Sequence, residues 1–445
     1  MKSTRPLPFL LLILSLFVAL AGSALAGSAT WNLSPTNGDW NTALNWTPNS
    51  VPDGPSDTAT FGVSNITNVS LSTAREVNGI VFNSGASGFV VNSTPTNSLT
   101  ISGAGITNNS GINQSFRVSA DAAGHPDGVE LTNGAAVGSS VTFTVDGGTS
   151  SGMFGGGLHF GDTSSAGPAT LIANGGTRGL GGVITFDGDS NGGTSRIEVF
   201  DNGTFDISAH NSPGVTIGSL EGSGSVLLGS NSLTTGSGHL KTAFSGVISG
   251  SGSLILNDSS TLTLQNANTY TGGTTIFLGG LIANNNTGSA TGPGPVQVNK
   301  DTLGGQGIIA GPVTIGAATG VNAKAYLEPS VATKGSILTI QSLLTFTKQG
   351  NFTNRVNTSN RTADAVVANG IIIQRGARYN LGVVANKQLP IGLVLVVMSN
   401  TSGSPISGSF LNFPEGGKIT SGRNTYQASY VGGDGNDMTL TVVTP

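Results

Sequence analysis

The chain has 445 residues, of which 69 are glycine, while only 9% are charged and 6% aromatic. A formal net charge of −4 without a basic stripe argues against nucleic acid as a partner. The absence of cysteine excludes disulfides, a lipoprotein anchor and thiolate metal sites.

Residues 1–26 have the features of a secretory signal peptide. Lys2 and Arg5 form a basic start, residues 9–20 are almost wholly apolar, and Ala24–Ala26 has the small-x-small pattern of a cleavage site. The apolar run of about 12 residues is shorter than the roughly 20 that span a bilayer. We therefore expect cleavage after Ala26 and no membrane span afterwards, in an exported protein that is extracellular or at the cell surface.

Residues 27–62 contain all three tryptophans, Trp31, Trp40 and Trp46. A stack of strands has an unpaired edge at each end, and this edge invites aggregation unless it is covered. We predict that the tryptophan-rich segment is an N-terminal cap over the first coil. The alternative is a sugar-binding platform, because aromatic faces can stack on pyranose rings.

Residues 63–243 consist of short β-branched or alternating runs that end in Gly, Asn, Asp or Ser. Val141–Val145 and Val183–Phe186 are examples, and no convincing amphipathic helix is present. Turns fall about every eight to twelve residues, which permits either a β-sandwich or a β-solenoid. The segment from Phe160 is echoed from Phe186. A spacing in the twenties predicts degenerate coils of an all-β solenoid.

A second repeat gives a similar spacing. Leu220–Leu228 recurs as Ile248–Leu256, at an offset in the upper twenties. The low charge agrees with a parallel stack, because like charges about 4.8 Å apart repel by roughly 3 kcal/mol at an effective dielectric constant of 20. Ser, Thr and Asn stack without this cost. The composition and the repeats together predict coils of about 28 residues.

The run from Asp187 to Glu198 fits the calcium loop of an EF-hand, with Asp189 and Asn191 at further ligand positions. An EF-hand requires flanking helices, whereas both flanks here have the pattern of strands. The segment 161–170 aligns with this loop and lacks its ligand set. We predict a polar turn, and a calcium ion held without helices stays open as the alternative.

Other motifs are weaker. Gly432–Asp437 resembles one calcium-binding nonapeptide of a β-roll, but the second copy that would share the ion is missing, so we predict a tight turn. His125, His159, His210 and His239 stand alone, without metal-ligand spacing. We therefore predict no catalytic, cofactor-binding or metal-binding residue and no cofactor.

Residues 244–330 carry a resemblance to a known family. The runs Phe244–Leu254 and Leu262–Ile276, the second containing Asn-Thr-Tyr-Thr-Gly-Gly-Thr-Thr, resemble the autotransporter-associated β-strand repeat of bacterial surface proteins. The similarity continues through Gly294–Asn299, Leu303–Ile309 and Gly311–Ile315. This resemblance implies a right-handed parallel β-helix that is exported and exposed at the cell surface.

Residues 331–445 are expected to form a C-terminal solenoid region and cap. Tyr430–Leu440 looks like the close of such repeat proteins. No series of alternating segments typical of an outer-membrane barrel is present, so we do not expect self-transport through a barrel of its own.

The sequence favours a structural or adhesive function without catalysis. Solenoids offer long regular faces that suit multivalent contact with extracellular glycans, matrix or other cells. The alternative is an extracellular polysaccharide lyase or hydrolase, because parallel β-helices also host such enzymes, although a fold alone is weak evidence of activity. This enzyme would need carboxylates and a basic residue on one face, for which Asp187, Asp189, Arg196 and Glu198 are the candidates.

Overall fold

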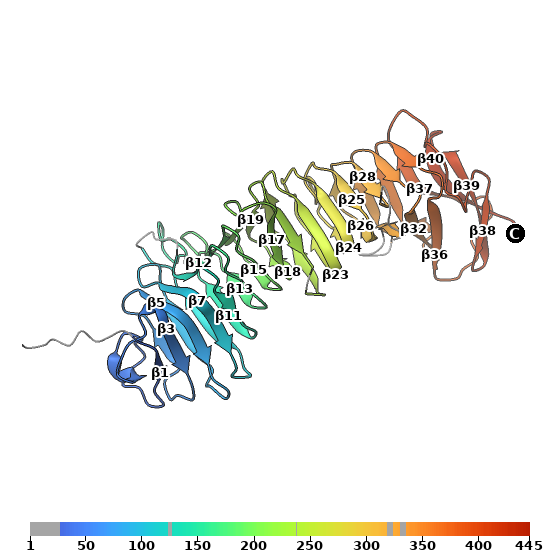
Figure 1. Cartoon of the computed structure of the whole chain (residues 1–445). Coiled ribbons are helices and arrows are strands. Elements are labelled where there is room, and N and C mark those ends of the chain that lie inside the picture. Colours follow the sequence, from blue (N-terminus) through green and yellow to red (C-terminus); the bar gives the residue numbers. More distant parts are fainter. Residues whose placement is uncertain (1–26, 123–126, 237, 318–323, 330–334) are drawn as a thin grey trace, which may run out of the picture.

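A computed structural model describes most of the chain, and the regular secondary structure of the described residues is almost entirely β-strand. The described residues form 40 strands and one short 3-10 turn, η1 (Ala43–Asn45). Parallel strands stack into a β-solenoid of about 13 turns, drawn as a long rod in Figure 1. The predicted all-β solenoid is therefore confirmed. The described residues are 27–122, 127–236, 238–317, 324–329 and 335–445, so the expected signal peptide lies outside them.

Each coil passes through up to three sheet faces, which we number in the order in which the chain visits them. Face 1 contains the longest run of strands in the N-terminal half. Its strands are β1 (Ala29–Trp31), β3 (Gly54–Phe61), β5 (Arg75–Phe82), β7 (Leu99–Asn108), β9 (Val129–Leu131), β12 (Gly157–Phe160), β14 (Val183–Phe186), β16 (Thr204–Asp206), β19 (Ser225–Leu227) and β22 (Val247–Ser249). The short β10 (Ala136–Val137) pairs with β7 beside this run.

Backbone hydrogen bonds carry face 1 onward where no regular strand is present. The amide of Thr269 donates a hydrogen bond to the carbonyl oxygen of Ile248 (2.9 Å), and the amide of Ala290 donates one to the carbonyl oxygen of Ile308 (2.8 Å). Regular strands then resume in the same face, namely β27 (Ile308–Ile309), β30 (Ile337–Ile340), β34 (Ala365–Ala368) and β37 (Val394–Asn400).

Most regular strands of face 2 lie from the middle of the chain onward, and only the short β10, between β9 of face 1 and β11 of face 3, precedes them among the separate strands of the described residues. Its other separate strands are β17 (Gly214–Ile217), β20 (Ser232–Thr235), β25 (Val296–Val298), β28 (Val313–Ile315), β31 (Leu344–Phe346) and β35 (Ile371–Ile373). Two long strands, β23 (Leu254–Leu264) and β24 (Thr274–Ala283), run through face 2 and continue into face 3. The register between these two strands shifts around Asn257, where they turn the corner between the faces.

Face 3 runs along almost the whole rod. Besides the ends of β23 and β24, its strands are β4 (Asn68–Ser70), β6 (Val90–Ser93), β8 (Gln114–Val118), β11 (Val141–Val145), β13 (Thr170–Ala173), β15 (Arg196–Val199), β18 (Ser219–Gly222), β21 (Lys241–Phe244), β26 (Asp301–Gly305), β29 (Ala325–Glu328), β32 (Gly350–Asn357) and β36 (Arg378–Val384). A short β33 (Thr362–Ala363) turns back antiparallel on β32.

The registers of paired strands give the lengths of the coils. Phe160 pairs with Phe186, so this coil has the length that its sequence repeat predicts. Val226 pairs with Ile248, which makes that coil shorter. The coil predicted from the repeat of Leu220 at Ile248 is therefore wrong, because Leu220 lies on face 3 and Ile248 on face 1. The same Gly-Ser turn motif serves two different corners, since such turns depend on local conformation and not on the face they join.

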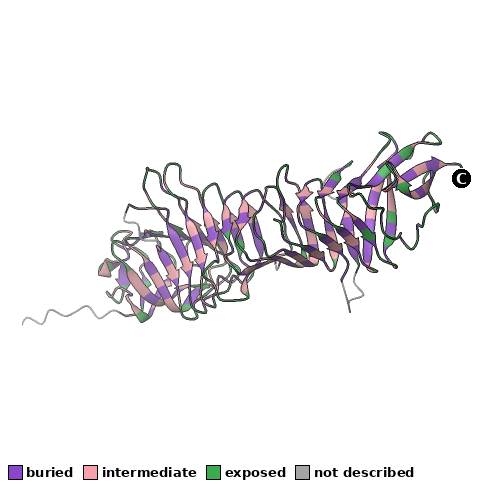
Figure 2. Cartoon of the chain, turned by 90° about the horizontal axis from the view of Figure 1, so that it is seen from above, coloured by how far each residue is buried: buried purple, intermediate pink, exposed green. Residues whose placement is uncertain are grey.

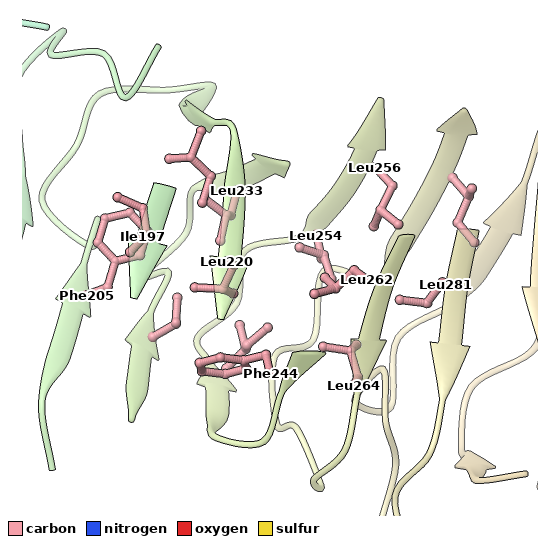
Figure 3. Close-up of a cluster of buried hydrophobic side chains, with 14 of the residues drawn as sticks. Ile197, Phe205, Leu220, Leu233, Phe244, Leu254, Leu256, Leu262, Leu264 and Leu281 are labelled. Carbon is pink, nitrogen blue, oxygen red and sulfur yellow. The ribbon is translucent and has the colours of Figure 1, made fainter. Parts of the chain in front are cut away.

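Alternation along the strands separates a continuous core from the solvent. In Val141–Val145 every second residue is buried, and the two threonines between them are partly exposed. Buried and more exposed bands alternate along the rod in Figure 2. Near the middle, Leu220 of β18, Leu254 and Leu262 of β23 and Leu281 of β24 fill the interior (Figure 3). The core is therefore a column of apolar side chains, and each coil depends on its neighbours to complete it.

The N-terminal end of this column is closed by aromatic side chains. β2 (Trp46–Thr47) pairs antiparallel with β1, outside the first parallel pair of face 1. Trp31, Trp40 and Trp46 are at most 2% exposed, and all three rings contact the ring of Phe61. Buried indoles offer no open face to a sugar, which argues against the platform alternative.

The C-terminal end changes from parallel to antiparallel pairing. The parallel stack of face 1 ends at β37, which pairs antiparallel with β40 (Asp437–Val443). The antiparallel order continues through β39 (Asn424–Gly432) to β38 (Lys418–Ser421). Gly432–Asp437 is the turn between β39 and β40, in agreement with the turn predicted there.

Candidate functional site

A hollow lies on the outer side of face 3, and we call it the Tyr326 groove. Its volume is about 350 Å³. It lies over β21, β23, β24, β26 and β29, and each of these strands belongs to a different, neighbouring coil. The lining residues used below are Lys241, Ser259, Thr261, Gly280, Thr302 and Tyr326.

The strand register explains why this place is hollow. Lys241 pairs with Thr261, then Thr261 with Gly280, Gly280 with Thr302, and Thr302 with Tyr326. These residues form one outward row across successive coils, and Gly280 at its centre has no side chain. Side chains that are in register across parallel strands form a continuous row, and a glycine leaves a space in that row. The groove is therefore a gap in the row, bounded by the threonines and closed at one end by the Tyr326 ring.

The side chains around the groove are mostly uncharged. Within the described chain, Lys241 has no carboxylate oxygen within 4.0 Å, and Tyr326 has no ring contact with another aromatic residue. Asp301 lies at the rim and accepts a hydrogen bond from the amide of Gly279 (3.0 Å). The groove thus presents hydroxyls, one aromatic ring, one ammonium and one carboxylate.

A Ser-His-Asp set lies beside the groove, but its geometry does not fit nucleophilic catalysis. His239 Nδ1 lies 2.8 Å from Asp258 Oδ2 and 3.4 Å from Ser259 Oγ. A catalytic histidine uses one ring nitrogen for the serine and the other for the carboxylate, whereas here both contacts fall on Nδ1. The His239 side chain is also 73% exposed. We therefore assign this set to the polar rim of the groove.

A second polar cluster lies on face 1, far along the rod toward the N-terminus. His159 Nε2 lies 2.9 Å from Asp187 Oδ2, and its Nδ1 lies 3.6 Å from Glu130 Oε1. The contact with Glu130, with a further contribution from Asp187, raises the pKa of His159 from 6.5 to about 9. The same histidine lowers the pKa of Glu130, while burial raises the pKa of nearby Asp127. A protonated imidazole thus links three successive coils.

A third charged cluster lies on face 3. Glu198 and Glu221 are directly paired in neighbouring strands, so their like charges face each other. Arg196 Nε lies 2.8 Å from Glu198 Oε1 and 2.7 Å from Glu221 Oε1. The guanidinium compensates the repulsion that a stack of like charges would otherwise carry.

The four residues predicted for the enzyme alternative do not meet in one place. Asp187 follows β14 on face 1 and contacts His159, whereas Arg196 and Glu198 lie on β15 of face 3. Asp189 accepts a hydrogen bond from Asn211 Nδ2 (3.0 Å). The structure brings together only Arg196 and Glu198, and it adds Glu221, which sequence reasoning missed.

The loop that fits a calcium-binding pattern joins two strands, β14 and β15, with no helix on either side. Its carboxylates point to different partners, since Asp187 contacts His159 and Glu198 contacts Arg196. In the described parts of the chain, no group of three or more His, Cys, Asp or Glu side chains is arranged to hold a metal ion. The arrangement of these residues fits a polar turn between coils.

Three of the four histidines make contacts between coils, namely His159, His210 and His239, while His125 lies outside the described residues. His210 Nε2 lies 2.7 Å from the carbonyl oxygen of Ser190, in the preceding coil. His159 pairs in register with Glu130, just before the paired Phe160 and Leu131. Sequence spacing hid these contacts because partners in a solenoid are a coil apart, and coil lengths vary.

Comparisons with known proteins add no identification. No protein-family model matches the chain, and a search of the curated proteins finds no significant similarity. Among the described residues no helix is both long and apolar enough to cross a membrane. The class established by the fold is a parallel β-solenoid, and the likeness of residues 244–330 to the autotransporter-associated repeat stays a resemblance.

Proposed function

We propose that the chain is an exported structural or adhesive solenoid that acts by contact along its outer faces. The observation that carries this proposal is the division between one continuous apolar core and outward rows of largely uncharged polar side chains. Neighbouring coils present equivalent positions about 4.8 Å apart. An extended partner can therefore repeat a weak contact many times, and linked weak contacts give strong retention.

Two features of the sequence support a location outside the cell. Residues 1–26 have the pattern of a cleavable signal peptide. Residues 244–330 resemble a repeat of bacterial surface proteins. The partners that we propose are extracellular glycans, matrix or other cells.

An adhesion assay tests this proposal. Beads coated with the purified protein are passed over layers of polysaccharide, matrix protein or bacterial cells, with albumin-coated beads as the control. We expect retention on at least one layer to rise more steeply than linearly with the density of protein on the bead, because multivalent contacts reinforce one another. Retention no greater than that of albumin beads on every layer would contradict an adhesive role.

One observation favours the alternative of a polysaccharide lyase or hydrolase. Glu130, His159 and Asp187 form a compact acid–base set, and burial raises the pKa of the neighbouring Asp127. A carboxyl group with a raised pKa beside a cation is a common feature of active sites, although ion-pair networks in scaffolds also produce it. This alternative predicts that the protein shortens a polysaccharide and that His159→Gln abolishes the shortening. The proposed structural or adhesive function predicts that neither the wild type nor His159→Gln shortens the polysaccharide.

A further inference from the structure

We propose that the Tyr326 groove binds a short segment of a carbohydrate chain, with one sugar ring lying against Tyr326. This inference rests on the proposed adhesive function and names the class of ligand and the place where it binds. The volume of about 350 Å³ falls within the roughly 300–1,000 Å³ of small-ligand sites. The groove crosses several coils, so a chain-like ligand can lie along the rod axis and continue beyond it.

The aromatic side chain is the first argument for a sugar. Tyr326 points outward from β29, between the buried Ala325 and Leu327, and its side chain is half-buried. Tyrosine combines an apolar ring with a polar hydroxyl. A pyranose has the same combination, since its C–H groups form an apolar face and its hydroxyls lie at the edge. A tyrosine without an aromatic partner, at the end of a groove, can therefore receive one face of the sugar.

The polar side chains are the second argument. Ser259, Thr261 and Thr302 carry hydroxyls, and each can both donate and accept a hydrogen bond, as the hydroxyls of a sugar do. Among the described residues of the lining, only Lys241 and Asp301 carry a full charge. A nucleic acid or a polyphosphate requires several cations, and these are not present on the lining. Uncharged hydroxyls beside one aromatic ring fit a carbohydrate better than either.

Gly280 gives a way to close the groove without removing any binding group. Its φ lies outside the left-handed region, and a Cβ at this position would lie 3.2 Å from Thr261 Oγ1 and 3.4 Å from Thr261 Cγ2. A rotation of the threonine side chain can relieve this contact. The variant Gly280→Thr therefore completes the outward row with a residue that favours strands, and it fills the space between Thr261 and Thr302.

The test uses the full chain and a panel of short oligosaccharides, some neutral and some containing uronate, first on an array and then by titration calorimetry. We expect the wild type to bind at least one of them. Tyr326→Ala should weaken binding about tenfold or more, Tyr326→Phe should retain most of it, and Gly280→Thr should abolish it. The matched control is Phe154→Ala, which removes an aromatic residue that is 43% exposed and lies outside the groove lining.

The outcomes separate the groove from the wider proposal. The inference is overturned if the wild type binds no oligosaccharide, or if Tyr326→Ala and Gly280→Thr both bind as the wild type does. If beads coated with these two variants still adhere as strongly as wild-type beads, the proposed adhesive function is retained and depends on another surface of the protein. Circular dichroism of each variant checks that lost binding is not lost folding. Binding of uronate oligomers alone, removed by Lys241→Gln, would also support the groove and would assign the ammonium to the sugar carboxylate.

Discussion

Nε2 of His159 lies 2.9 Å from Oδ2 of Asp187, although the two residues are far apart in the sequence. They belong to successive coils, because His159 lies on β12 and Asp187 directly follows β14. Glu130 on β9 approaches the same ring from the other side. This sandwich of one imidazole between two carboxylates ties three coils together, and its protonation state should control how tightly they hold.

The first prediction concerns the pH dependence of stability. The pKa of His159 is raised from 6.5 to about 9, so its contribution to stability is complete below about pH 6.5 and is lost as the pH rises through 9. The pKa of Glu130 is lowered from 4.5, so its contribution is present above that value and lost as the pH falls below it. We expect the cluster to stabilise the fold most between the ordinary pKa values of the two groups, 4.5 for Glu130 and 6.5 for His159. By about pH 10 its contribution to the free energy of unfolding should be smaller by about 1–2 kcal/mol.

Urea unfolding at pH 6, 8 and 10, followed by circular dichroism, measures this effect in the wild type and in His159→Gln. The glutamine variant keeps the size and polarity of the side chain but does not titrate. We expect the difference in unfolding free energy between the two proteins to shrink as the pH rises. A difference that stays constant across this range would show that the charge of the imidazole has no part in holding the coils.

The second prediction concerns the aromatic column in the N-terminal half of the core. The rings of Phe160 and Phe186 are stacked, with centroids 4.6 Å apart and planes inclined by 11°. Phe160→Ala should leave a cavity in the core and cost about 3–5 kcal/mol. Because each coil contacts only its neighbours, the loss should be concentrated around β12. Hydrogen exchange followed by mass spectrometry should show that the variant exchanges faster than the wild type in β9, β12 and β14, with a smaller increase in β29 and β32.

Phe200→Ala is the control for this experiment, because Phe200 is 37% exposed and lies just after β15. We expect its exchange to match that of the wild type. Equal exchange changes along the whole rod in Phe160→Ala would mean that the solenoid unfolds as one unit and not coil by coil.

The third prediction tests the close stacking of the turns. A Cβ on Gly246 would overlap the backbone carbonyl oxygen of Gly224 in the neighbouring coil and would lie 2.6 Å from Cζ of Phe244. A backbone atom cannot move aside as a flexible side chain can, so Gly246→Ala should lower the melting temperature. Gly62→Ala is its partner experiment, because a Cβ there meets no atom within 4 Å. Equal melting temperatures of the two alanine variants would contradict the close contact between Gly246 and Gly224.

The fourth prediction concerns export. When the full chain is expressed in a bacterium, we expect the intact mass of the exported protein to correspond to a chain that begins at Gly27. Ala26→Arg should block cleavage, because signal peptidase requires a small residue before the cut. Recovery of the full-length wild-type chain from the cytoplasm alone would contradict the proposed export.

Local sequence patterns predicted the strands better than the site. The alternation in Val141–Val145 and in Val183–Phe186 gave β11 and β14 with their observed limits, because a side chain's face depends only on its position along its own strand. The Tyr326 groove depends instead on which residues become neighbours across coils. Thr261 pairs with Gly280, and Thr302 pairs with Tyr326 across a longer stretch of chain. No fixed period aligns such positions, so the gap at Gly280 is visible only in the folded chain.

The central claim is that the solenoid holds carbohydrate or another surface polymer by contact and does not transform it. The most direct test incubates the purified protein with polysaccharides and measures, in the same samples, the bound fraction and the chain length by size-exclusion chromatography with a reducing-end assay. The account predicts that at least one polysaccharide is bound and that its chain length stays unchanged. Shortened chains and new reducing ends, lost again in His159→Gln, would contradict it and would favour the enzyme.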